Sequence, residues 1–256
     1  MHSTTSQPTV HALPAPDAKR RRIYLMRHGA VSYFDETGRT IVNPDTVPLT
    51  QDGIQQAQQA GAAFAQAGIY FDKIVCSDLL RTHQTADYVV HALADAGLPT
   101  VVPHSVAALA ELKGGKLSDI PSARVREAFL GAFDGVVQES MQFLGGETIG
   151  QLLDRVLPEI DALRADRSWD VCLLVLHGGV NRAVLSYLLT GQRLFLGSIA
   201  QSTACINAID VGDHREDTVL RLINFAPRDL LHTSTRKTTM EHLLDQYLRL
   251  KSLMNK

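Results

Sequence analysis

The sequence predicts an α/β fold: a three-layer sandwich with a mostly parallel central sheet, helices on both faces and a small helical cap insertion. Short apolar segments alternate with longer segments of helical periodicity. Two of the apolar segments, residues 23–26 and 171–176, lead directly to a histidine, His28 and His177. Parallel strands end at one edge of a sheet, where open α/β folds bind their ligands. We therefore expect both imidazoles at one such edge.

The first half of the chain predicts a tail followed by alternating strands and helices. Residues 1–20 are rich in Ser, Thr, Pro and Ala without hydrophobic periodicity, which is typical of a flexible tail. In order, we then expect a strand at 23–26, a loop at 30–48, a helix capped by Thr50, a strand at 74–76, a helix at 79–94 and a strand at 100–102. Residues 21–256 are expected to form a single domain.

The second half predicts the cap insertion and the remaining layers of the sandwich. Residues 117–144 are less regular, contain a helical stretch at 124–133, and are taken as the cap. We then expect a helix at 148–165 that Pro158 bends, a strand at 171–176, a helix at 180–189 that Gly191 ends, strands at 204–211 and 219–224, and a helix at 240–250.

Composition indicates an ordinary globular protein rather than a nucleic-acid or membrane protein. Of its 256 residues, 45% are hydrophobic, and the net charge of -2 gives no general attraction to polyanions. The basic run at 19–22 is interpreted as solvated rather than as a nucleic-acid or targeting patch. No segment resembles a membrane span or a secretion signal, so a cytoplasmic location is expected. Cys76, Cys172 and Cys205 lie in apolar runs, which favours buried thiols over a zinc site or a disulfide.

Charged and imidazole side chains suited to a phosphoryl group follow several of the predicted strands. Arg27 precedes His28, and Arg81 lies in the first turn of the helix after the strand at 74–76. A phosphate monoester carries a charge of about -1.5 to -2, which two arginines can bind and stabilise during transfer. Taken singly, Arg81 is equally consistent with an ordinary helix arginine, and each histidine with a structural role at a strand end.

The combined pattern resembles the histidine phosphatase superfamily, in the branch that includes phosphoglycerate mutases, over about residues 22–226. The motifs that carry the resemblance are Arg27-His28-Gly29, Ser77-x-x-x-Arg81-Thr82-x-x-Thr85 and His177-Gly178, in that order. The resemblance implies that His28 is the nucleophile and that Arg27 and Arg81 hold the phosphoryl oxygens. It also implies that His177 donates to an equatorial oxygen, with the backbone N–H of Gly178 beside it at a helix start.

Glu111 is the candidate acid that protonates the leaving group across the phosphoryl group from His28. The stretch from Leu109 to Leu117 resembles the family's Leu-x-Glu, followed four residues later by glycine. The alternative is a loop carboxylate that faces water.

Two departures from the family pattern bear on the activity. Phe34 stands where the common loop has a phosphate-binding asparagine, and Asp35 is excluded from the binding set because a carboxylate repels a dianion. The Tyr33-Phe34 pair suits either the substrate mouth or the core. Glu111 is followed by Leu112-Lys113 rather than by the stretch typical of mutases, which favours hydrolysis.

We therefore expect a phosphomonoester hydrolase of the histidine acid phosphatase type, which uses no metal or other cofactor. Its expected partner is a small phosphorylated metabolite, with no nucleic acid and no membrane, and whether it forms a homodimer is left open. Two alternatives remain at this point. One is a phosphoglycerate mutase-type phosphotransferase, and the other is a catalytically weak, phosphate-binding regulatory module.

Overall fold

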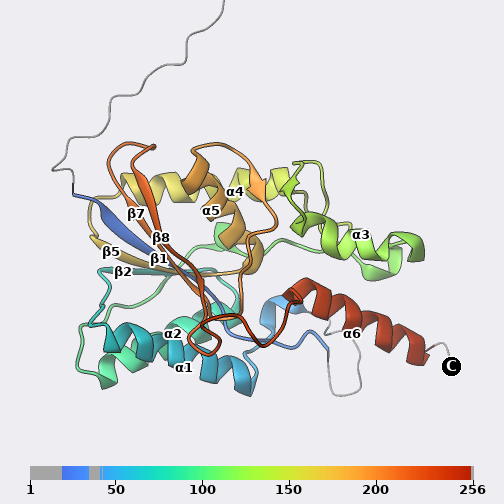
Figure 1. The fold of residues 1–256 in the computed structure, drawn as a ribbon, viewed down its shortest axis with the longest axis horizontal. Coiled ribbons are helices and arrows are strands. Elements are labelled where there is room, and N and C mark those ends of the chain that lie inside the picture. Colours follow the sequence, from blue (N-terminus) through green and yellow to red (C-terminus); the bar gives the residue numbers. More distant parts are fainter. Residues whose placement is uncertain (1–18, 35–40, 42, 255–256) are drawn as a thin grey trace, which may run out of the picture.

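A six-stranded sheet forms the centre of the computed structural model (Figure 1), in the order β3-β2-β5-β1-β7-β8. The structure describes residues 19–34, 41 and 43–254. The strands of the sheet are β1 (Arg21–Arg27), β2 (Lys73–Cys76), β3 (His104–Ser105), β5 (Val171–Leu176), β7 (Ile206–Val211) and β8 (Thr218–Phe225). The first four in spatial order are parallel, and β7 is antiparallel to both of its neighbours. The predicted mostly parallel sheet is therefore confirmed.

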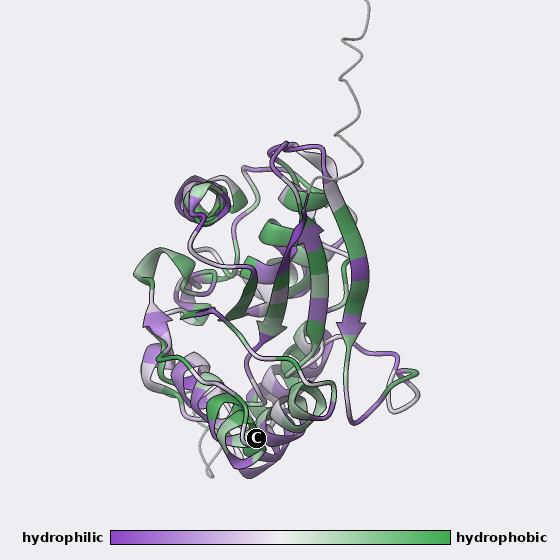
Figure 2. Cartoon of the chain, turned by 90° about the vertical axis from the view of Figure 1, so that its left-hand side faces the viewer, coloured by the Kyte–Doolittle hydropathy of each residue, from purple (hydrophilic) through white to green (hydrophobic). Residues whose placement is uncertain are grey.

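Helices cover both faces of this sheet, as the three-layer prediction requires. In Figure 1, α1 (Gln51–Gln66) and α2 (Leu80–Asp95) lie below it, and α4 (Ile149–Ala165) and α5 (Gly178–Thr190) lie above it. Successive side chains of a strand point to opposite faces, and both faces of β1 are buried. Ile23 and Leu25 accordingly join one hydrophobic cluster, whereas Tyr24 and Met26 join the other. In Figure 2 the strands are mostly hydrophobic, whereas the helices carry both kinds of residue.

Local sequence signals fix the ends of the helices that position the site. The hydroxyl of Thr50 accepts a hydrogen bond from the N–H of Gly53 and begins α1. Thr148 and Gln151 form a reciprocal capping box at the start of α4. Gly191 ends α5 with φ of 65°, a left-handed conformation that favours glycine.

The predicted cap, residues 117–144, contains short helical turns and packs against the C-terminal helix. Its longest helix is α3 (Val125–Leu130), which shares a hydrophobic cluster with α6 (Thr239–Met254) through Phe129 and Leu244. The remaining short elements are η1 (Pro44–Thr46), η2 (Ala107–Leu109), η3 (Leu117–Asp119), η4 (Ser122–Arg124), η5 (Gly131–Phe133), β4 (Val136–Val137) and β6 (Phe195–Leu196). Strands β4 and β6 pair with each other and connect the cap to the segment after α5.

Several sequence-based boundaries need correction. Strand β7 begins at Ile206 rather than at residue 204, and α6 extends to Met254 rather than to residue 250. The strand predicted at 100–102 is wrong: those residues are irregular, the Val102 side chain is 89% exposed, and β3 lies at His104–Ser105. Proline explains the shift, because Pro103 has no N–H for a ladder hydrogen bond and ends the apolar run. Helix α5 also begins two residues earlier than predicted, because His177 itself is its N-cap.

The described part of the chain begins at the basic run. Most of the predicted tail lies outside the described residues. The interpretation of the run as solvated is wrong for Arg21, which is buried, while Lys19, Arg20 and Arg22 form ion pairs with Asp170, Asp217 and Asp210. The three cysteines are buried, as predicted, and burial raises the pKa of Cys76 to about 11. Among the helices that the structure describes, none has both the length and the apolar character that crossing a membrane requires.

Candidate active site

The two histidines of the sequence motifs meet at the carboxyl edge of the sheet. In the β1–β5 pairing Arg27 lies opposite Leu176, and the N–H of His28 donates to the Leu176 carbonyl at 2.9 Å. His28 and His177 therefore directly follow the ends of two neighbouring strands, at the same edge of the sheet. Their ring centroids are 5.2 Å apart at an interplanar angle of 63°. Both side chains are buried, with 2% and 0% of their surfaces exposed.

His28 is held as a neutral imidazole with one free nitrogen. Its Nδ1 lies 2.7 Å from the carbonyl oxygen of Gly29. Because a carbonyl oxygen only accepts, Nδ1 carries the proton and Nε2 keeps its lone pair. Burial, and then the charges of Arg81 and Arg27, hold the pKa of His28 well below 6.5. Near neutral pH the free Nε2 is thus a potential nucleophile.

Gly29 is required at this turn because helix α1 begins directly against it. A Cβ at position 29 would lie 2.3 Å from the carbonyl oxygen of Gly53, closer than any side chain tolerates. In turn, a Cβ at position 53 would lie 2.1 Å from the carbonyl oxygen of Ala30. Two glycines therefore allow the backbone after His28 to pack on the first turn of α1.

His177 is oriented by a serine from the second motif. The Oγ of Ser77 lies 2.7 Å from its Nε2 and 2.9 Å from the Oγ of Thr82. The other ring nitrogen, Nδ1, is buried and has no hydrogen-bond partner among the described residues. Burial, followed by His28 and the site arginines, holds the pKa of His177 well below 6.5. The two imidazoles are therefore both neutral near neutral pH.

Arg27 and Arg81 reach the same site from different elements. One terminal nitrogen of Arg27 donates to the carbonyl oxygen of Gln201 at 2.6 Å and to the hydroxyl of Thr239 at 2.9 Å. A terminal nitrogen of Arg81 donates to the carbonyl oxygen of Pro44 at 2.9 Å. The Nε atoms of both are buried without a partner in the described chain, and neither guanidinium forms an ion pair there. The cluster thus carries two positive charges that no described carboxylate pairs with.

Glu111 is packed against the start of α5 rather than directed into solvent. Its Oε1 accepts hydrogen bonds from the N–H groups of Leu112 and Gly179, at 2.9 and 3.1 Å. A Cβ at position 179 would lie 2.6 Å from that oxygen, so this approach requires glycine. Because Gly179 follows His177 by two residues, this contact places the Glu111 carboxylate at the turn of the chain that carries His177. The alternative of a solvated loop carboxylate does not match this geometry.

Gly178 is the first residue of α5 and lies between two arginines. A Cβ there would lie 3.5 Å from the Cζ of Arg27 and 3.3 Å from a terminal nitrogen of Arg182. The pKa of Arg182 is lowered to about 10, mainly by burial and then by the charge of Arg27, whereas the charge of Glu111 opposes this shift. The positive charges of Arg27 and Arg182 therefore both lie close to Gly178. The Arg182 side chain donates to the carbonyl oxygens of Gly178 and Gly197.

The sequence did not single out several residues that hold the site together. Gln201 accepts from Arg27 through its backbone, and its side-chain amide bonds to Asn181 of α5 and Asn207 of β7 at 2.9 to 3.0 Å. Thr239 contacts Arg27 from a position 212 residues away. The motif contained Ser77, but without a role. No local pattern marks Gln201 or Thr239, because their partners lie in distant segments.

Of the aromatic pair Tyr33-Phe34, one residue lies in the core and the other lies near the site. Phe34, at the position of the family's asparagine, is buried at 8% exposure. Burial raises the pKa of Tyr33, on which the charges of Arg81, Glu111 and Arg27 also act. Tyr33 therefore lies beside the charged cluster. Asp35 lies outside the described residues.

Comparison with known proteins identifies the family. Residues 23–224 match the model of the histidine phosphatase superfamily, branch 1. The chain belongs to this superfamily. It is 32% identical over 179 residues to a 2,3-bisphosphoglycerate-dependent phosphoglycerate mutase of Azorhizobium caulinodans, covering 66% of this chain and 81% of that protein. It is 28% identical to a probable phosphoglycerate mutase of Proteus mirabilis, covering 66% and 74%.

Solved structures of phosphatases share the fold. The alpha-ribazole phosphatase of Shigella flexneri aligns with a TM-score of 0.59 and 24% identity, over 79% of this chain and 96% of that one. A mycobacterial glucosyl-3-phosphoglycerate phosphatase aligns with a TM-score of 0.61 and 23% identity, over 80% and 99%. The α/β prediction is confirmed by these alignments. Phosphatases and mutases both occur among the similar proteins.

Proposed function

We propose that this histidine phosphatase superfamily member is a phosphomonoester hydrolase that acts through a covalent phosphohistidine at His28. Three buried nitrogens around His28 carry the proposal: Nε of Arg27, Nε of Arg81 and Nδ1 of His177, none partnered among the described residues. Buried donors ordinarily have partners, and a phosphoryl group offers several acceptor oxygens and the opposite charge. The proposed substrate is a small phosphorylated metabolite.

In the first step the lone pair of His28 Nε2 attacks phosphorus and the bond to the ester oxygen breaks. Its Nδ1–H remains bonded to Gly29, which stabilises the positive charge that develops on the ring. Arg27, Arg81 and the Nδ1–H of His177 hold the phosphoryl oxygens, with the N–H of Gly178 beside them at the start of α5. Glu111 gives a proton to the departing alkoxide, so the products are an alcohol and the phosphohistidine.

In the second step water attacks the phosphohistidine and the P–N bond breaks. The carboxylate of Glu111 takes one proton from that water. The oxygen of the water bonds to phosphorus and becomes part of the released phosphate. His28 recovers its lone pair and Glu111 its proton, which returns both groups to their starting state. Apart from the substrate and water, all the reacting groups in this scheme are side chains or backbone of the chain itself.

Substitution of the proposed nucleophile tests this function. His28→Ala should abolish the release of phosphate from 4-nitrophenyl phosphate, and wild-type enzyme quenched during turnover should hold an acid-labile phosphoryl group. Excess chelator should leave the wild-type rate unchanged. His91→Ala, an exposed histidine of α2, is the matched control and should stay active. Full activity of His28→Ala would disprove the proposal. Phosphate binding without any phosphoenzyme would support the regulatory-module alternative.

A mutase-type phosphotransfer is the second candidate, favoured by the 32% identity to a phosphoglycerate mutase. The same phosphohistidine serves both reactions, and the difference lies in whether water or a second hydroxyl accepts the phosphoryl group. Isomerisation of 3-phosphoglycerate that depends on a bisphosphate primer would favour the mutase. Release of phosphate without isomerisation would favour the hydrolase.

A further inference from the structure

Arg155, on helix α4, binds the backbone of the segment that carries Glu111. One of its terminal nitrogens donates to the carbonyl oxygens of Ala108 and Ala110, both at 2.7 Å. The other terminal nitrogen donates to the carbonyl oxygen of Glu111 itself, at 3.1 Å. The guanidinium therefore fixes the stretch of backbone from which the carboxylate of the proposed acid extends.

Glu147 pairs with Arg155 and binds the same segment just after Glu111. Its two carboxylate oxygens accept from Nε and from a terminal nitrogen of Arg155, at 2.7 and 2.8 Å. One of them also accepts from the N–H of Lys113 at 3.0 Å, and the N–H of Glu147 donates to the Lys113 carbonyl oxygen at 2.8 Å. Together with the three carbonyls, this pair uses all five N–H groups of Arg155.

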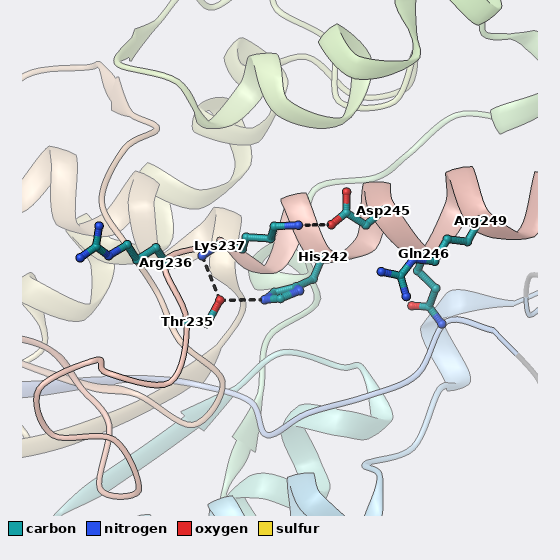
Figure 3. A pocket seen from close by; sticks show the side chains of 7 residues that line it. All are labelled: Thr235, Arg236, Lys237, His242, Asp245, Gln246 and Arg249. Carbon is teal, nitrogen blue, oxygen red and sulfur yellow. Dashed lines mark hydrogen bonds and ion pairs between the residues drawn. The ribbon is translucent and has the colours of Figure 1, made fainter.

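The pair is charged and largely shielded from water. The side chains of Arg155 and Glu147 are 20% and 11% exposed. Burial favours the protonated form of Glu147, but hydrogen bonds from Arg155 and from the N–H of Lys113 outweigh it and lower the pKa of this carboxyl. By contrast, the Lys237–Asp245 pair beside a cavity at the start of α6 (Figure 3) is about half exposed. A shielded pair with every donor bonded has little freedom to move, so the backbone that it binds stays in place.

We propose that Arg155 and Glu147 are positioning residues that fix the carboxyl group of Glu111 for proton transfer to the leaving group. This inference rests on the proposed function and adds to it two residues outside the sequence motifs. The N–H groups of Leu112 and Gly179 hold the carboxylate at its oxygens, whereas the pair holds the backbone behind it. Proton transfer needs the two groups within hydrogen-bond reach, so even a displacement of about 1 Å slows the reaction strongly.

The dependence on the leaving group distinguishes positioning from a merely structural role. Arg155→Lys keeps the charge but loses the planar guanidinium with its five donors. It should lower kcat/KM for an alkyl phosphate about tenfold more than for 4-nitrophenyl phosphate, whose leaving group needs no proton. In a Glu111→Gln background the same substitution should not change this ratio further, because the group that it positions is already absent. Equal losses on both esters, or a further change in the double variant, would overturn the inference.

Two more variants provide a second route and a control. Glu147→Gln removes the charge of the partner with almost no change in size and should give the same substrate-dependent loss, so it replaces Arg155→Lys if that variant does not fold. Arg124→Gln breaks the exposed ion pair with Glu127 in the cap and should keep the wild-type ratio. A ratio that changes as much in this control as in Arg155→Lys would count against a specific role of the buried pair.

An NMR signal reports on the Glu111 carboxylate without any reaction. The N–H of Gly179 donates to it at 3.1 Å, so in Arg155→Lys the amide proton signal of Gly179 should move toward its position in Glu111→Ala. The signal should stay in place in Arg124→Gln. A Gly179 signal that Arg155→Lys leaves unchanged would overturn the inference. Inactivity of the wild-type enzyme on both esters would instead disprove the hydrolase, and the Gly179 signal would then decide the positioning role by itself.

Discussion

The Oγ of Ser77 lies 2.7 Å from Nε2 of His177, whose other ring nitrogen, Nδ1, has no partner among the described residues. A serine hydroxyl has one proton, and Ser77 can give it either to His177 or to Thr82, 2.9 Å away. When it goes to His177, Nδ1 must carry the ring proton. Ser77 is then a positioning residue that keeps a donor directed at the phosphoryl site.

Replacement of that serine tests its positioning role. Ser77→Ala should lower kcat/KM about tenfold, because His177 loses the hydrogen bond that selects its tautomer. Nitrogen NMR of His177 should show the proton shifting from Nδ1, a change that loosened packing alone does not produce. Ser105→Ala, at an exposed serine of β3, provides the control. An unchanged tautomer would show that Ser77 serves packing only.

Acid should destabilise the fold through its two buried imidazoles. The pKa values of His28 and His177 are lowered in the folded chain, so below about pH 6.5 the unfolded chain binds protons that the folded chain does not. The free energy of unfolding should therefore fall as pH drops from 6.5 towards the folded pKa values, by about 1.4 kcal/mol per pH unit for each histidine. Urea unfolding at several pH values measures the slope, and His28→Asn should reduce it.

The acidic limb of the activity profile should lie well below pH 6.5. A nucleophile must keep its lone pair, and burial together with Arg81 and Arg27 keeps His28 neutral in mild acid. The pH dependence of kcat/KM for 4-nitrophenyl phosphate measures the midpoint in the free enzyme. Arg81→Met removes one of these charges and should move the midpoint upward. A midpoint at or above 6.5 in the wild type would contradict the described environment.

Loss of the Glu111 carboxyl should slow the hydrolysis of substrates with poor leaving groups more than that of substrates with good ones. An alkoxide needs a proton as it leaves, whereas 4-nitrophenolate is stable without one. Glu111→Gln should therefore slow an alkyl phosphate by about 100-fold or more, and 4-nitrophenyl phosphate much less. Gly179→Ala should give the same pattern more weakly, because its Cβ displaces the carboxylate. Equal losses on both substrates would exclude Glu111 as the acid.

Sequence signals were sufficient for the centre of the sheet but not for its edge. Strands β1 and β5 are buried on both faces, so they appear as continuous apolar runs that end at His28 and His177. The edge strand β3 is only two residues long. It begins after Pro103, because proline has no N–H to donate to the neighbouring strand. The apolar pair before that proline therefore suggested a strand in the wrong place.

The residues that hold the site side chains in place could not be predicted from the sequence for a different reason. Glu111 could be proposed from its neighbours along the chain, but its contact with Gly179 depends on how two loops meet. Gln201 and Thr239 lie 174 and 212 residues from Arg27, and neither has a neighbouring motif. Such contacts are set by packing in three dimensions, and a single sequence carries no local trace of them.

The position of β1 between β5 and β7 has a consequence for biosynthesis. In this pairing Arg22 lies opposite Val171 on one side and Asp210 on the other. The strand that leads to His28 is translated before both of its neighbours, so it stays unpaired until β5 and β7 have left the ribosome. Such long-range pairing slows folding and leaves an apolar segment open to aggregation or chaperones. A truncated translation product that ends before β5 therefore cannot assemble this catalytic centre.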